Sequence, residues 1–327
     1  MTVMVTGAGI VGTHLASALV KRGETPILFD KSLQPNSIAK LVPLDRIKMI
    51  AGDILDFEEL SRVIRKNKVK VVVHTAAAIK FENSPRVGVS VNYGGTANVL
   101  EAARISDVNR IVFTSSHSVY QAWTRGWEKD EPFDEDCHIE PGNLYAATKA
   151  GSELLGTTYA RKYGLEFISL RYPFIFGPWI GTTSGSANEL ISQIIRNVSE
   201  GMSKPIRRSF DADEFIYSID VARSILTAID SKKPAHDAYN IGMGEICTFE
   251  RLVKLVEDIM DSSTKITLEP PGTRRRAHKG FAYRTAPASI KRAEIELGYR
   301  PIFNLEAALR DYSAWMTSSL RSPPSPE

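Results

Sequence analysis

The sequence VMVTGAGIVGTHLASALVKRG, residues 3–23, decides the fold of this chain. Its first four residues predict a short buried strand, and the residues after Gly12 follow helical periodicity. Gly7, Gly9 and Gly12 lie in the turn between the two elements. Glycine has no Cβ, so the backbone amides of this turn can approach a pyrophosphate before the helix begins. The stretch therefore predicts a strand–turn–helix unit that binds a dinucleotide.

Two carboxylates follow at the ends of later predicted strands. Asp30 ends the next strand, eighteen residues after Gly12. There it would accept hydrogen bonds from the adenosine ribose hydroxyls and repel a 2′-phosphate, which favours NAD over NADP despite the adjacent Lys31. Asp53, in AGDILD, ends the third strand and could meet the adenine or cap the following helix.

Apolar runs alternate with helical segments throughout the first half of the chain. The runs VMVTG, PILFD, RIKMIAGD, KVKVVVHTAA and RIVFTSS read as strands, with helices around 57–66, 92–105 and 143–163 between them. The pattern predicts an α/β fold, a Rossmann-type doubly wound parallel sheet with a smaller C-terminal substrate lobe. We expect residues 1–177 and about 213–243 to form the NAD-binding domain, about 178–212 and 244–320 the substrate lobe, and 321–327 a disordered tail.

Composition restricts the function to small-molecule chemistry. The chain has 327 residues, a formal net charge of +3, and only two cysteines, Cys137 and Cys247. This argues against a disulfide framework, a cysteine-rich metal site, and nucleic acid or membrane partners. The sequence shows no signal-peptide core and no apolar run long enough to cross a bilayer, so we expect a cytoplasmic protein without a bound metal.

Tyr145 and Lys149, in NLYAATKAG, form the candidate catalytic pair. Their four-residue spacing points a phenol and an ammonium from the same face of a helix. A phenol that works as a base near neutrality needs its pKa lowered by about three units, or roughly 4 kcal/mol. Lys149 and a cationic nicotinamide ring could together supply this stabilisation.

The chain resembles the extended short-chain dehydrogenase/reductase family, also called the NAD-dependent epimerase/dehydratase family, from Thr2 to about Trp315. The motifs that agree are GAGIVG (7–12), HTAAAI (74–79), VNYGGTANVLEAA (91–103), FTSSHSVY (113–120), YAATK (145–149), RYPFIFGP (171–178), EFIYSIDVA (214–222) and YNIGMGE (239–245). One departure lies in the phosphate loop, where the family usually shows TGxxGxxG and this chain has one residue fewer between the first glycines.

The resemblance implies hydride transfer between a substrate carbinol and NAD. Tyr145 would be the acid/base, Lys149 would lower its pKa and hold the ribose, and Ser116 would hydrogen-bond the substrate oxygen. The implied cofactor-binding residues are Gly7, Gly9, Ile10, Val11, Gly12, Asp30, Asp53, Ile54, Ala76, Ala77, Ala78, Asn92, Thr114, Tyr145, Lys149, Tyr172 and Pro173. The implied substrate-binding residues are Ser116, His117, Phe174, Arg274 and Arg275.

Departures from the family pattern narrow the reaction. Dehydratases of the family carry an acidic pair where this chain has His117 and Ser118, and uronate decarboxylases carry a glutamate at the second position. Both reactions are therefore disfavoured. His117 could still act on a substrate hydroxyl, but a bystander role is the more common one for such a histidine.

Other departures concern the substrate. Nucleotide-sugar members have an asparagine and an arginine where this chain has Phe174 and Asp213, which weakens the expectation of a nucleotide-linked substrate unless 207–208 supply the missing charge. Three arginines at 274–276 could bind an anionic group or form a solvated loop, and Trp123 with Trp127 could cover the substrate or pack on the surface.

Three functions remain open. An epimerase, favoured by the whole-chain pattern, would oxidise a carbinol of a sugar and return the hydride to the other face of the ketone. A dehydrogenase of a small sugar acid or polyol would release the ketone, and a non-catalytic NAD-binding regulator is the third alternative. Helices near 92–105 and 143–163 resemble the dimer contact of the family, so a homodimer is expected.

Overall fold

The computed structural model describes residues 1–79, 84–120, 131–181, 187–202, 205–206, 212–232, 234–261, 266 and 286–321. Its strands form a seven-stranded sheet in the order β3-β2-β1-β4-β5-β6-β9 and a three-stranded sheet in the order β10-β8-β7. The strands are β1 (Val3–Thr6), β2 (Ile27–Asp30), β3 (Lys48–Ala51), β4 (Val71–His74), β5 (Arg110–Ser116), β6 (Glu166–Tyr172), β7 (Phe174–Phe176), β8 (Ala212–Tyr217), β9 (Ala238–Asn240) and β10 (Ile246–Thr248).

Every pairing in the large sheet is parallel. The predicted Rossmann-type sheet is therefore confirmed. Its strand order reverses between β1 and β4, and ligands of doubly wound sheets bind at the carboxyl ends of the strands beside such a reversal. The phosphate loop follows β1, and the HTAAAI segment follows β4, so both reach this edge.

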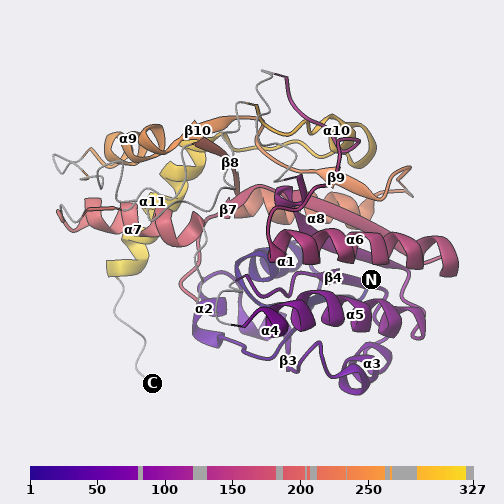
Figure 1. Ribbon diagram of the computed structural model, residues 1–327. Helices are drawn as coiled ribbons and strands as arrows, with labels where there is room; N and C mark the ends of the chain where they lie inside the picture. Colours follow the sequence, from indigo (N-terminus) through magenta and orange to yellow (C-terminus); the bar gives the residue numbers. More distant parts are fainter. Residues whose placement is uncertain are drawn as a thin grey trace.

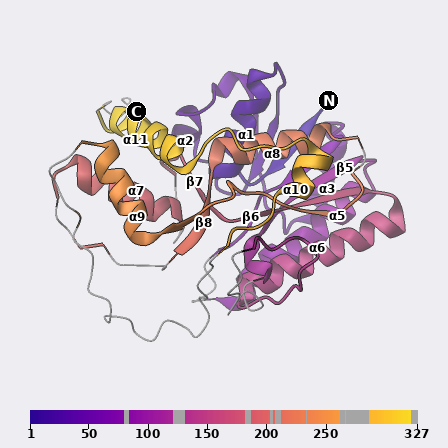
Figure 2. The same cartoon turned by 90° about the horizontal axis from the view of Figure 1, so that it is seen from above.

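Helices cover both faces of the large sheet (Figures 1 and 2). α1 and α8 pack together on one face, and α3, α5 and α6 cover the other. The helices are α1 (Ile10–Lys21), α2 (Pro35–Ala39), η1 (Leu44–Arg46), α3 (Phe57–Lys66), α4 (Pro85–Val89), η2 (Ser90–Gly94), α5 (Gly95–Arg104), η3 (His117–Tyr120), α6 (Leu144–Tyr163), α7 (Ala187–Ser199), α8 (Ser218–Asp230), α9 (Phe249–Ile259), α10 (Lys291–Leu297) and α11 (Leu305–Arg321).

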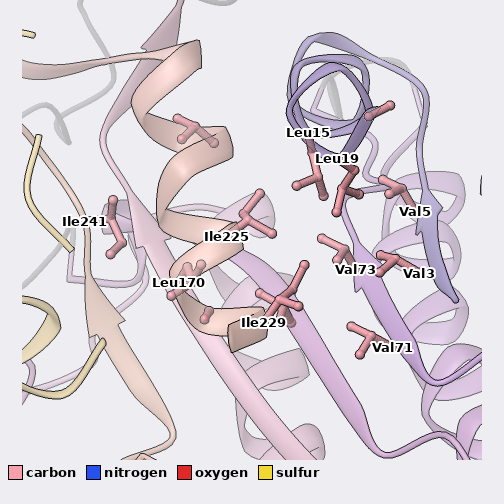
Figure 3. Packing of buried hydrophobic residues seen from close by; sticks show 14 of the residues in the cluster. Val3, Val5, Leu15, Leu19, Val71, Val73, Leu170, Ile225, Ile229 and Ile241 are labelled. Atoms are coloured by element: carbon pink, nitrogen blue, oxygen red, sulfur yellow. The ribbon is translucent and has the colours of Figure 1, made fainter. Parts of the chain in front are cut away.

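Aliphatic side chains fill the layer between the sheet and α1 with α8. Val5 and Val73 on adjacent strands face Leu15 of α1, while Leu170 and Ile225 continue the same core toward α8 (Figure 3). All five side chains are completely buried. Burying each such side chain contributes about 1.5–3 kcal/mol to folding. This core fixes α1, and with it the phosphate loop, on the sheet.

A second cluster builds the smaller lobe from α7, α9, α11 and the three-stranded sheet. β8 pairs with β7 and β10, whereas α8, which follows it directly, packs on the large sheet. The junction between the lobes thus runs through 212–230, and the domain ranges given above stay a prediction. No helix within the described ranges is long and apolar enough to span a membrane.

One predicted helix differs from expectation. The segment 92–105 is not one regular α-helix, because Ser90–Gly94 forms a π-helical turn before α5 begins at Gly95. A π-helical turn inserts an extra residue per turn and changes the direction of the side chains within it.

Candidate active site

The glycine turn after β1 has the tight geometry that its sequence predicts. Gly7 has φ of +98°, and a Cβ on it would lie 2.6 Å from Thr75 Oγ1. A Cβ on Gly12 would lie 1.9 Å from the Gly7 carbonyl oxygen. Gly9 is different, since no described atom lies within 4 Å of a Cβ placed there. Gly7 and Gly12 thus close the turn, whereas Gly9 keeps backbone accessible.

The amide groups at the start of α1 remain available for an anion. Gly9 is the N-terminal cap of α1, and no described side chain caps this end. Uncapped amides at a helix N-terminus bind phosphate through hydrogen bonds and the helix dipole. The side chains of Ile10 and Val11 are partly buried and pack on the core.

Asp30 lies beside the same turn and holds it. Its carboxylate accepts hydrogen bonds from the backbone N–H groups of Ala8 and Ser32, each at 2.7 Å. A carboxylate has about four acceptor positions, so ribose hydroxyls can still bind Asp30.

Asp53 accepts from Leu55 N at 3.0 Å and lies 3.8 Å from the Lys31 ammonium. It does not cap α3, because Asp56 does so. Ile54 is buried against Gly95 of α5, where a Cβ would overlap it at 2.4 Å.

Asn92 fixes the segment after β4. From the π-helical turn, its amide donates to Ala78 O at 2.9 Å and accepts from Ala78 N at 2.7 Å. The same amide group donates to Thr148 Oγ1 at 3.1 Å. Ala76 and Ala77 precede this anchor and are partly exposed at the carboxyl edge of the sheet. The anchor links this edge directly to α6.

α6 carries the predicted Tyr–Lys pair in its first two turns. Asn143 caps the helix by accepting from Ala146 N at 2.9 Å, and Gly164 ends it in the left-handed conformation. Thr148 donates to the Tyr145 carbonyl at 2.7 Å, so the Asn92–Thr148 contact also holds the residue that carries the phenol. This cap and these bonds set the height of Tyr145 above the sheet.

Ser116 and Tyr145 meet at the end of β5. The Tyr145 phenol is hydrogen-bonded to the Ser116 side chain. Ser116 Oγ also accepts from Ser118 N at 3.1 Å, within the short helix η3. Because this amide occupies an acceptor position, the Ser116 hydroxyl hydrogen can point toward the phenol side. The structure therefore brings together two of the three predicted catalytic groups.

Lys149 lies one turn further along α6 and is 3% exposed. Its ammonium donates to Thr114 O at 2.7 Å and lies 4.7 Å from the centroid of the Phe113 ring. Burial lowers the pKa of Lys149 to about 8, with the Glu153 carboxylate acting in the opposite direction. Its ammonium lies 5.8 Å from the centroid of the Tyr145 ring.

Burial is the main influence on the pKa of Tyr145. Although the residue is partly exposed, burial of its phenol raises the pKa to about 12, and the hydrogen bond with Ser116 opposes this rise only in part. A cation beside Tyr145 would favour the ionised phenol and so lower this pKa.

The residues predicted at the end of β6 differ in where their side chains lie. Tyr172 pairs with Ser116 across β5 and β6, but its hydroxyl is hydrogen-bonded to Ser224 of α8 at 2.9 Å, so its side chain is directed into the core. Pro173 and Phe174 follow at the sheet edge and are partly exposed.

His117, predicted to contact substrate, is 2% exposed and lies beside Phe133 and Glu214, which argues against direct contact. Arg274 and Arg275, the other arginines at 207, 208 and 276, and Trp123 with Trp127 lie outside the described residues.

Sequence reasoning assigned no role to Thr148 or Glu214, and it considered Ser118 only as a departure from the acidic pair of the dehydratases. Thr148 and Ser118 act through hydrogen bonds with groups that carry no sequence signal, a backbone carbonyl and a neighbouring hydroxyl. Glu214 looked like an ordinary strand residue, yet its carboxylate is completely buried. Only the EFIYSIDVA motif, read as a returning segment, marked its neighbourhood.

The family model described as "NAD dependent epimerase/dehydratase family" matches residues 3–242. The chain belongs to this family. UDP-glucuronate 4-epimerase 5 of Arabidopsis thaliana is 30% identical over 96% of this chain and 75% of its own length. UDP-glucuronate 4-epimerase of Thermodesulfobacterium geofontis is 27% identical, covering 97% of this chain and 96% of its own.

The fold of this family member also matches solved structures. The UDP-glucose 4-epimerase of Thermus thermophilus in complex with NAD has a TM-score of 0.83, with 24% identity over 98% of this chain and all of that chain. The open backbone at Gly9, the uncapped start of α1 and the Asp30 carboxylate fit a dinucleotide with unmodified ribose. NAD, the cofactor predicted from the sequence, is the cofactor of the family.

Proposed function

We propose that the protein is an NAD-dependent 4-epimerase of a nucleotide-linked sugar. The observation that carries this proposal is the hydrogen-bonded Ser116–Tyr145 pair at the end of β5, with the buried Lys149 ammonium one helical turn away and the glycine turn on the same sheet edge. These groups suit the oxidation and reduction of one carbinol. The relatives add the type of reaction, since both named enzymes are UDP-glucuronate 4-epimerases.

The Ser116 hydroxyl and the Tyr145 phenol would both bind the substrate oxygen that changes between alcohol and ketone. Tyr145 would take the proton of the alcohol and later return it, while Ser116 donates a hydrogen bond to the carbonyl. Both side chains stand on rigid supports, the last residue of β5 and the capped first turn of α6. Such supports keep the two oxygens at fixed separation through both half-reactions.

NAD would be held by the amides of the glycine turn, by Asp30 at the adenosine ribose and by Lys149 at the other ribose. When bound, it supplies the acceptor and donor of the hydride. The segment 76–78, fixed by Asn92, would line the same site. Lys149 would also keep a positive charge near Tyr145 below pH 8, where it is protonated.

The proposal of a nucleotide-sugar substrate rests on the relatives. The negative charge of Asp213 would oppose the binding of a diphosphate near it. Asp213 of β8 is partly exposed and accepts from Glu214 N at 2.8 Å. A carboxylate near a diphosphate opposes its binding. Phe174 contacts Phe215 with ring centroids 5.9 Å apart, which adds an apolar contact nearby. We therefore expect a nucleotide sugar to bind with a different set of phosphate contacts from those typical of the family.

The decisive test is conversion without added cofactor. Purified protein is incubated with UDP-glucuronate, and the 4-epimer is sought by anion-exchange chromatography and NMR. The matched control is Tyr145→Phe, which should produce none. Release of NAD on denaturation would fit an enzyme that retains its cofactor between half-reactions. Failure to convert any nucleotide sugar, together with stoichiometric reduction of added NAD by a sugar acid or polyol, would establish the dehydrogenase instead.

We further propose that the enzyme is a homodimer. Val87 of α4, Tyr93 of η2 and Leu154 of α6 are large apolar side chains exposed on helices that contact one another. Leu154 is 65% exposed. A second copy meeting this face would bury these side chains in a helical contact of the kind that stabilises symmetric dimers.

Leu154→Glu should convert the dimer to a monomer in analytical ultracentrifugation. Ile295→Glu is the matched control, because Ile295 is 83% exposed on α10, outside this face. A wild type that sediments as a monomer at all concentrations would contradict the dimer. A cytoplasmic location stays a prediction from the sequence.

A further inference from the structure

A buried carboxylate, Glu214, lies next to the short helix η3 (His117–Tyr120), the turn that follows Ser116. Glu214 of β8 is completely buried, and its two oxygens accept hydrogen bonds from Gly244 N at 3.2 Å and Ala288 N at 3.0 Å. A Cβ on Gly242 would lie 2.1 Å from Glu214 Oε1, so glycine is needed there for the carboxylate to fit. Glu214 thus joins three segments that are distant in sequence.

His117 lies between this carboxylate and the catalytic serine, close to Glu214 but beyond hydrogen-bond distance. Its Nδ1 lies 3.7 Å from Glu214 Oε2, and its ring meets the edge of Phe133 at a centroid distance of 6.1 Å. His117 is also the residue between Ser116 and Ser118, and the Ser118 amide donates to Ser116 Oγ at 3.1 Å. The position of the His117 side chain therefore helps to set the peptide plane that presents this amide.

The other end of the same turn is held separately. Tyr120, the last residue of η3, donates through its hydroxyl to Asn240 Oδ1 at 3.0 Å and accepts from the Arg171 guanidinium. Tyr120 thus attaches the turn to the large sheet, whereas His117 faces Glu214 of the smaller lobe. Of the two residues, His117 is the one next to Ser116.

We propose that His117 and Glu214 form a positioning pair that holds the Ser118 amide on Ser116 Oγ and links the smaller lobe to the catalytic serine. Both side chains are buried, so the pair would act through the turn and not by contact with the substrate. Loss of the contact would release the Ser118 amide, and Ser116 would then lose its fixed orientation toward Tyr145. The catalytic part of this inference rests on the proposed function, whereas its structural part does not.

The test compares three substitutions of His117 that differ in the position of the side-chain polar group. In His117→Asn the side-chain amide can occupy the place of Nδ1, in His117→Gln the amide lies one bond further out, and the side chain of His117→Leu has no polar atom to face Glu214. We expect kcat of the Asn variant to remain within about threefold of wild type, and the Gln and Leu variants to lose about tenfold or more, with KM and the affinity for NAD changed less than twofold.

A second readout needs no turnover. Hydrogen exchange in the peptide spanning 116–120 should be about tenfold faster in the Gln and Leu variants than in wild type and the Asn variant, while exchange in α6 stays the same. Tyr120→Phe is the matched control, since it loosens the far end of the turn and should change kcat less than His117→Leu does. If the wild type converts no sugar nucleotide, the proposed function fails and exchange alone decides this inference.

The inference would be overturned by equal kcat in all three His117 variants, by rate losses that merely follow their melting temperatures, or by unchanged exchange in the Leu variant. Should His117→Leu not fold, the comparison of the Asn and Gln variants decides by the same criteria.

Discussion

Replacing Lys149 with methionine should change how the stability of the protein depends on pH. Lys149 is nearly completely buried, and burial lowers its pKa from 10.5 to about 8. Methionine has a similar length and carries no charge. The variant therefore removes the ionisable group and keeps most of the packing against Phe113.

The sign follows from where the proton binds. Below pH 8 the lysine is protonated in both the folded and the unfolded state, so folding carries the full cost of burying an ammonium. Between pH 8 and 10.5 the folded lysine is neutral while the unfolded one is still charged, so the free energy of unfolding rises with pH. The difference of about 2.5 units corresponds to about 3 kcal/mol over the whole window.

The assay is urea unfolding of cofactor-free protein at several pH values. Relative to Lys149→Met, the wild type should gain about 2 kcal/mol between pH 7 and pH 9.5, about 1.5 units above the folded pKa. Other titrating groups are common to both proteins and cancel in the difference. Lys162→Met is the matched control, because Lys162 lies exposed on the same helix and its ammonium loses little water on folding.

A difference between wild type and Lys149→Met that does not vary with pH would refute this reasoning. That result would mean that the ammonium keeps its ordinary pKa, because Thr114 O and the Phe113 ring stabilise it to the same extent that water does in the unfolded chain. The Lys149 contribution to the charge around Tyr145 would then persist to higher pH, and burial would not be the controlling influence.

Three further outcomes are expected. Tyr145→Phe should lower kcat by a factor of about 10²–10⁴ without lowering the melting temperature, as steady-state kinetics and calorimetry would show. Gly9→Ala should fold with unchanged stability but bind NAD at least about tenfold more weakly in titration calorimetry, whereas Gly12→Ala, whose Cβ would overlap Gly7 O at 1.9 Å, should lose stability before NAD is added. Burial lowers the pKa of His14 to about 4, so the free energy of unfolding should fall as the pH drops from 6.5 toward 4. His14→Gln can keep the hydrogen bond to Pro178 O. In acid unfolding experiments this variant should lose about 3 kcal/mol less stability over that range than the wild type.

The sequence predicted the large sheet well because parallel strands that are buried on both faces consist of short, continuous apolar runs. Val3–Thr6 and Val71–His74 are short apolar runs bounded by turn residues, and both are completely buried strands of the sheet. α3 lies where the sequence predicted a helix, around 57–66; Asp56 caps it, and its apolar face is strongly periodic. Local chemistry decides such elements, so local patterns reveal them.

The site was predictable in its residues and less so in its electrostatics. Spacing alone suggested Tyr145 with Lys149, and family resemblance selected Ser116. Neither could give the pKa of the phenol, because burial depends on the packing of distant segments around it. The π-helical turn at Asn92 and the burial of Glu214 were not predicted for the same reason, because both depend on tertiary contacts.

The cofactor-free pKa of Tyr145 bears on why an epimerase suits this site. With a pKa of about 12, only about one phenol in 10⁵ is ionised at pH 7. A cation placed about 4 Å away contributes about 4 kcal/mol at an effective dielectric constant of 20, which raises that fraction by about a thousandfold. When NAD is bound, its oxidised nicotinamide ring would supply a positive charge to this site, whereas the reduced ring is neutral. Tyr145 would therefore tend toward a base while the cofactor is oxidised and toward an acid while it is reduced, which is the order of proton transfers that inversion of a single carbinol requires.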